Sequence, residues 1–147
     1  ELIDVDLSKV KLEDATLTGV KFSGGHGKLD LSWVDLRGLN LRRADLRGQE
    51  LRGLNLRGID LRAANLRRAS FYSADLSEAN LSGANLSGAN LKFTNMTNAN
   101  LKDVKLNDAI LCNTIMPQAT TIGRMRTGET RLVPNPPSYL NVIYKDC

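Results

Sequence analysis

The sequence contains few of the residues that form the commonest catalytic and metal-binding sites. Its 147 residues include one histidine, His26, and two cysteines, Cys112 and Cys147, with no C-x-x-C pair. A zinc site of the usual Cys/His kind therefore cannot be assembled, and neither cysteine has a histidine nearby in sequence to activate it. No acid–base set can be named, so we expect no catalytic residues, no metal, no cofactor and no enzyme activity.

Aromatic residues and long apolar runs are also scarce. Aromatic side chains make up 5% of the chain. No apolar run approaches the roughly 18 residues of a membrane-spanning helix, so we expect no membrane span. Bases of single-stranded nucleic acid stack on aromatic side chains, which are almost absent from the arginine-rich segment. The composition therefore argues against nucleic acid as the main partner.

A repeat of five residues fills most of the chain, as in "LRGLNLRGIDLRAANLR" from Leu51 to Arg67. We define the leucine-type residue that follows the polar position of each unit as its centre. The centres are Leu7, Leu12, Leu17 and Phe22, and then every fifth residue from Leu31 to Met116, which makes 22 units. A second small or apolar residue usually precedes the centre by two positions, and a polar residue, often Asp or Asn, lies between them.

A period of five fits neither an α-helix nor a flat strand. Five residues advance about 500° on a helix, so successive centres would scatter around its axis. On a strand, a step of five places successive centres on opposite faces. A chain that turns by about 90° at each unit brings every centre inward and closes a square coil of about 20 residues. Such coils would stack through backbone hydrogen bonds at about 4.8 Å.

The units ADLRG, ANLRR, ADLSE, ANLSG and ANLKF resemble the A-(D/N)-L-x-x motif of pentapeptide-repeat proteins, above all cyanobacterial and other bacterial members. The resemblance covers residues 5–24 and 29–118. It implies an all-β fold, a right-handed parallel quadrilateral β-helix of about 5.5 coils. It implies little about function, because one fold hosts many roles.

The repeat divides the chain into a solenoid, residues 1–118, and a tail, residues 119–147. The register slips at 24–28, where the nine residues from Phe22 to Leu31 replace the expected ten. Three glycines there allow a tighter or bulged corner. The tail has three of the four prolines and several apolar residues. We expect it to fold back as a C-terminal cap over the last coils, with an exposed docking arm as the alternative.

Residues 20 apart should lie one above the other. The polar positions then alternate between acids and amides, as in Asp35, Asn55, Asp75 and Asn95. This order avoids like charges directly opposite each other, and short Asp and Asn side chains can bond the backbone of a nearby corner. We therefore interpret these residues as builders of corners and not as catalytic carboxylates.

Nine arginines form what we call the arginine belt. Consecutive units face different directions, so the belt should surround nearly two coils. Two interpretations stay open: a solvated surface produced by repeat duplication, or a binding surface for an acidic partner. The belt consists of Arg37, Arg42, Arg43, Arg47, Arg52, Arg57, Arg62, Arg67 and Arg68.

The two cysteines allow one disulfide. A bond between Cys112 and Cys147 would fix the tail and indicate an oxidising compartment such as the periplasm or the thylakoid lumen. The alternative is two free thiols, which would fit the cytoplasm.

The leading hypothesis for function is a non-enzymatic scaffold or protein-interaction module, a monomer or a weak end-to-end dimer, with a protein partner. A first alternative is anion or nucleic-acid binding through the arginine belt. A second is topoisomerase protection by DNA mimicry, which is known in some pentapeptide-repeat proteins. Those members are strongly acidic, and the net charge of +4 disfavours this role.

Overall fold

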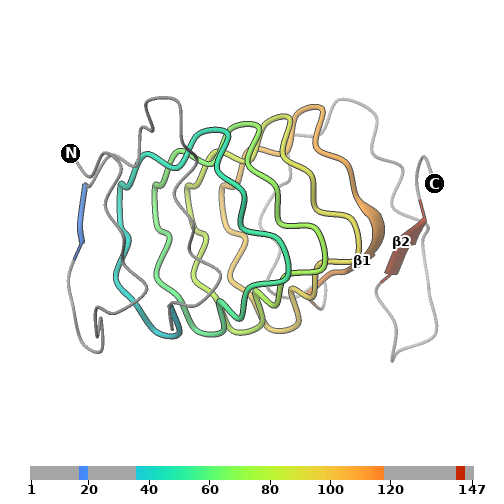
Figure 1. The fold of residues 1–147 in the computed structure, drawn as a ribbon, viewed down its shortest axis with the longest axis horizontal. Coiled ribbons are helices and arrows are strands. Elements are labelled where there is room, and N and C mark those ends of the chain that lie inside the picture. Colours follow the sequence, from blue (N-terminus) through green and yellow to red (C-terminus); the bar gives the residue numbers. More distant parts are fainter. Residues whose placement is uncertain (1–16, 20–35, 118–141, 145–147) are drawn as a thin grey trace.

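A computed structural model describes residues 17–19, 36–117 and 142–144. Residues 36–117 wind into square coils stacked along one axis (Figure 1). Neighbouring coils are joined by parallel bridges between residues 20 apart, from Asn40 with Asp60 to Asn95 with Ile115. The predicted parallel quadrilateral β-helix is therefore confirmed.

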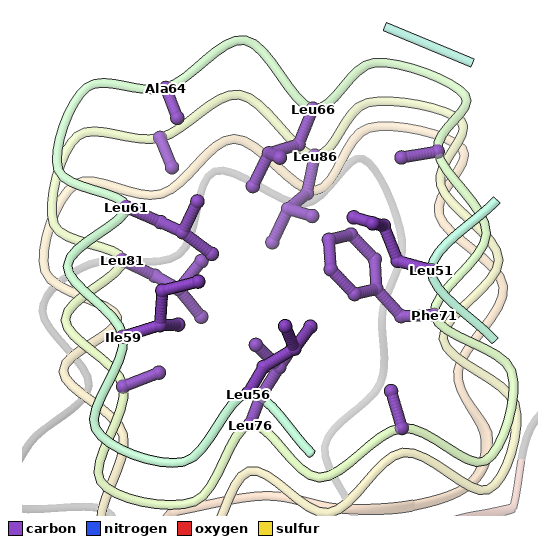
Figure 2. Packing of buried hydrophobic residues seen from close by; sticks show 14 of the residues in the cluster. Leu51, Leu56, Ile59, Leu61, Ala64, Leu66, Phe71, Leu76, Leu81 and Leu86 are labelled. Carbon is purple, nitrogen blue, oxygen red and sulfur yellow. The ribbon is translucent and has the colours of Figure 1, made fainter. Parts of the chain in front are cut away.

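Each side of the square presents two residues of a unit to the interior. Figure 2 shows Ile59 and Leu61 on one side and Ala64 and Leu66 on the next, all pointing inward. The centres are fully enclosed, with exposed fractions of 0% for Leu66 and Phe71. Burying a side chain of this size contributes roughly 1.5–3 kcal/mol. The period of five thus gives one continuous core, because every unit turns the chain by one corner.

The two residues after each centre form the corner. The chain turns from one side of the square to the next through a four-residue turn, as where the Ala64 N–H donates to the Leu61 carbonyl at 3.1 Å. The second corner residue has a positive φ in all 16 units from Leu36 to Leu111. A type II turn requires this at its third residue and favours glycine there. Six of these positions are glycine, and ten carry a side chain, as at Ala63 with φ 55°.

The Asp and Asn residues before the centres hold the corners, as predicted. Each accepts a hydrogen bond from the backbone N–H two residues later, as from Ser77 to Asp75 Oδ1 at 2.9 Å. The bond occurs in ten units of the described solenoid; Asn65, whose Oδ1 is buried without a partner, is the exception. The ten acceptors are Asn40, Asp45, Asn55, Asp60, Asp75, Asn80, Asn85, Asn90, Asn95 and Asn100.

The N-terminal register differs from a simple loss of one residue. In a regular coil the Leu41 N–H donates to the Asp60 carbonyl, the residue just before the centre Leu61, at 2.8 Å. The Leu17 N–H instead donates to the Asn40 carbonyl, just before the centre Leu41, at 3.0 Å. Leu17 therefore stacks on Leu41, which follows it by 24 residues, whereas stacked residues of the regular coils are 20 apart. The predicted slip itself, at 24–28, lies outside the described residues.

Two short strands close the C-terminal end of the stack. Strand β1 (Cys112–Ile115) pairs antiparallel with β2 (Val142–Tyr144), with Ile115 opposite Val142. The other edge of β1 bonds the preceding coil, since the Ile115 N–H donates to the Thr94 carbonyl at 2.9 Å. Strand β2 therefore covers an edge that would otherwise present unpaired backbone groups (Figure 1). The rest of the tail, 119–141 and 145–147, lies outside the described residues.

Candidate functional site

The belt arginines lie at corners, in the two positions that follow each centre. We number the corners by their first described residues: the first corner is 37–38, the second 42–43, the third 47–48 and the fourth 52–53, each followed by the equivalent residues of the next coils. All four corners carry arginine. Arg37 and Arg57 are on the first corner, Arg42, Arg43 and Arg62 on the second, Arg47, Arg67 and Arg68 on the third, and Arg52 on the fourth.

Ion pairs hold several of the belt arginines. Arg47 pairs with Asp45 at 2.7 Å and Arg57 with Glu78 at 2.7 Å, and Arg62 pairs with Asp60. The hydrogen bond from Arg62 is the main cause that lowers the pKa of Asp60. Such exposed pairs contribute about 0–1 kcal/mol each. Their main effect is to neutralise the charge of the three paired arginines.

These pairs share a two-point geometry. Arg62 donates from Nε to Asp60 Oδ1 at 2.8 Å and from Nη2 to the other carboxylate oxygen. Arg57 reaches one coil further and donates from Nε and Nη2 to the two oxygens of Glu78, at 3.3 and 2.7 Å. Such bidentate contacts are the preferred way for arginine to hold a carboxylate. An arginine directly after a centre can therefore hold an acidic side chain by donating two hydrogen bonds to it.

Four exposed belt arginines on the second and third corners form no ion pair among the residues that the structure describes: Arg42, Arg43, Arg67 and Arg68. Arg52, on the fourth corner, forms none either and packs on an aromatic ring instead. One side of the square, which runs through Asp45 and Asn65, connects these two corners. Belt arginines occur at all four corners, but most of those without an ion pair lie along that side.

The fourth corner carries an aromatic column that the sequence reasoning missed. The Arg52 guanidinium lies 5.0 Å from the centroid of the Tyr72 ring, and Tyr72 packs edge-on against Phe93 at 5.4 Å. Phe93 is 47% exposed. Tyr72 occupies the position one coil after Arg52, and this stacking was a signal that could have predicted the cation–π contact.

Cys112, at the fourth corner in the last coil, is buried and disulfide-bonded. Cys147 lies outside the described residues, so the pairing of these two cysteines stays a prediction. Among the described residues there is no group of three His, Cys, Asp or Glu side chains placed to hold a metal ion. The same residues include no helix long and apolar enough to cross a membrane.

The family model for pentapeptide repeats matches in eight copies, over residues 30–68, 50–83, 64–103 and 79–118. The chain belongs to the pentapeptide repeat family. The family seen in the repeat units is therefore confirmed. Pentapeptide repeat proteins have no general biochemical activity assigned to the fold, so membership alone leaves the role of this chain open.

Several solved structures are similar to this pentapeptide repeat protein. One from the Arabidopsis thaliana thylakoid lumen is 28% identical, with a TM-score of 0.58 over 71% of this chain and 70% of that one. Rfr23 from the cyanobacterium Cyanothece 51142 is 25% identical, with a TM-score of 0.41 over 78% and 95% of the two chains. HetL, involved in heterocyst differentiation regulation in Nostoc, is 29% identical, with a TM-score of 0.23 over 73% and 62%. No curated protein matched the chain.

Proposed function

We propose that this pentapeptide repeat protein is a non-enzymatic scaffold that binds other proteins through the outer surface of its solenoid. The observation that carries the proposal is the filled interior. Centres such as Leu66, Phe71 and Leu76 have exposed fractions of 0%, so the chain's own side chains occupy the space inside the coils. A partner would therefore contact the corners and the outward positions between them.

The backbone ladder supports this function because it fixes the outer side chains in advance. The Ala63 N–H donates to the Ser82 carbonyl at 2.9 Å, and the Arg68 N–H donates to the Ser87 carbonyl at 3.0 Å. Corner residues are thus bonded to the next coil at the position where their side chains leave the solenoid. Binding by a surface that is ordered beforehand loses less conformational entropy than binding by a mobile loop.

The test compares the protein with a surface variant that keeps the core. In the variant, the arginines of the first two described coils are replaced by serine, which later corners already carry, as at Ser77 and Ser82. Both proteins are immobilised and exposed to a lysate at low salt under oxidising conditions, and a captured protein is then purified and titrated. We expect saturable binding to the wild type that the variant weakens. If nothing binds the wild type above an inert protein, the scaffold proposal fails.

We also propose that the protein works in an oxidising compartment. Two observations support this: Cys112 is disulfide-bonded, and the chain is similar in sequence and fold to a protein of the thylakoid lumen. Disulfides persist in such compartments and are rare in the cytosol. Acid quenching of source cells, followed by alkylation of free thiols, tests the proposal. We expect no labelled cysteine before reduction and two after it; two labelled thiols before reduction would place the protein in a reducing compartment.

A further inference from the structure

We propose that one side of the solenoid, between the second and third corners, binds a short acidic segment of a partner protein. We call it the cationic side; it comprises residues 40–48 and 60–68. The inference rests on the proposed scaffold function and specifies which surface is used and what chemistry the partner presents.

The charge distribution singles out this side. Residues 40–48 and 60–68 contain six arginines and two aspartates, a formal net charge of +4. The remaining residues of the first two described coils, 36–39, 49–59 and 69–75, contain three arginines and two acids, a net charge of +1, and Arg57 pairs with Glu78 of the next coil. The belt therefore has one strongly cationic side and a nearly neutral remainder, which suits a single docking surface for an anionic partner.

The arginines of this side are available for a partner. Arg43 and Arg68 are exposed second corner residues with φ of 57°, and neither forms an ion pair within the described solenoid. Arg42 and Arg67 are exposed first corner residues, and Arg42 contributes only a minor part of the lowered pKa of Asp60. Two free guanidinium groups thus flank the side at each of its two corners.

The chemistry of the neighbouring corners favours carboxylates as ligands. Arg47 and Arg62, on these same two corners, each hold an aspartate through Nε and Nη2. Where an acid is within reach, a corner arginine on this side binds it with a two-point contact. Arg42 and Arg67 occupy the same backbone position, directly after a centre, so an acidic side chain from a partner can be held in the same way.

The dimensions favour a short peptide over a nucleic acid. Arg43 and Arg47 are four residue steps apart along extended chain, at most about 13 Å, and the two arginine layers are one coil apart, about 4.8 Å. An extended peptide of about five residues spans that width. A specific duplex interface is much larger, usually more than about 600 Å². Single-stranded nucleic acid needs aromatic platforms, and Tyr72 and Phe93 lie on the fourth corner instead.

The experiment uses a fluorescein-labelled peptide of alternating glutamate and serine, ten residues long, titrated with the full chain and followed by anisotropy at low salt. The site variant carries Arg42→Ser, Arg43→Ser, Arg67→Ser and Arg68→Ser. A matched control removes four positive charges from the first and fourth corners, with Arg37→Ser, Arg52→Ser, Arg57→Ser and Lys92→Ser. Serine already occupies both corner positions, at Ser73 and Ser77, and circular dichroism checks that each variant keeps its fold.

We expect the site variant to bind the peptide about tenfold more weakly and the control to change by less than about threefold, because several small ion-pair contributions add. Equal losses in both variants would show that only net charge matters and would overturn the inference. Tighter binding of a ten-nucleotide single-stranded DNA, or of vesicles with anionic lipid, would overturn it in favour of those partners.

The result also separates this inference from the proposed function. If a partner protein captured by the wild type binds the four-arginine variant equally well, the scaffold function stands and the cationic side is not its site. If the wild type captures no partner but binds the acidic peptide specifically, the side binds anions and the scaffold function fails.

Discussion

Exchanging alanine and glycine between two neighbouring corners should move stability in opposite directions. Gly58 has φ +69°, and a Cβ added to it would meet no atom within 4 Å. Gly58→Ala therefore tests the backbone alone, without a steric clash. An L-residue in the left-handed region costs roughly 1–2 kcal/mol. Alanine also restricts the unfolded chain, which returns about 0.4–1 kcal/mol. The expected loss in the free energy of unfolding is about 0.5–1 kcal/mol.

Ala63 provides the reciprocal change. It is exposed and has φ 55°, one unit after Gly58 and at the same corner position. Ala63→Gly should raise the free energy of unfolding by a similar amount, about 0.5–1 kcal/mol. A double variant with both changes has the composition of the wild type. Because the two sites lie on different corners, their effects should add and nearly cancel.

Urea unfolding followed by far-UV circular dichroism measures both effects as shifts in the midpoint at constant slope. The order of stability should be Ala63→Gly, then the wild type with the double variant, then Gly58→Ala. If Ala63→Gly destabilises the protein, the left-handed corner is not a source of strain, and the reasoning is wrong. A changed slope would instead show that the solenoid no longer unfolds as one cooperative unit.

Three further changes test the ion pair, the core and the cap. The pKa of Asp60 is lowered by Arg62, so its stabilisation exists above about pH 4 and is lost as pH falls. Asp60→Asn should therefore reduce stability at pH 7 and reduce the loss between pH 7 and about pH 3, measured by thermal unfolding. Thr94 donates from its buried hydroxyl to the Phe71 carbonyl at 2.7 Å, and Thr94→Val should cost about 1 kcal/mol in urea unfolding; an unchanged midpoint would refute this. Ile143→Pro should disrupt β2 and uncover β1, so sedimentation should show concentration-dependent self-association; a strictly monomeric variant would contradict the capping role.

The period of five was sufficient to predict the coil. A turn of about 90° at each unit places every centre inside and stacks Leu61 on Leu81, and the bridge between Asp60 and Asn80 confirms that spacing. The same argument could not place Leu17. A count of residues does not say which centre lies next to Leu17, and the backbone hydrogen bond from the Leu17 N–H to the Asn40 carbonyl decides that.

Which arginines are neutralised was also beyond the sequence. Arg62 pairs with Asp60, two positions earlier on the same side, whereas Arg57 pairs with Glu78, which lies in the next coil. The sequence alone does not select between such acids, because stacking brings each belt arginine close to several carboxylates. The choice depends on side-chain directions at the corner. The concentration of free charge on the second and third corners therefore needed the structure.

The antiparallel pairing of β1 with β2 determines which insertions of repeat units the protein can accommodate. A next coil would have to run parallel to β1, so β2 ends the winding. An insertion of one five-residue unit before β1 would rotate the closing strand by a quarter turn and carry Cys112 to a different corner. An insertion of one whole coil would lengthen the stack by about 4.8 Å and return both to the fourth corner. Duplications of whole coils therefore preserve the closure, and duplications of single units do not.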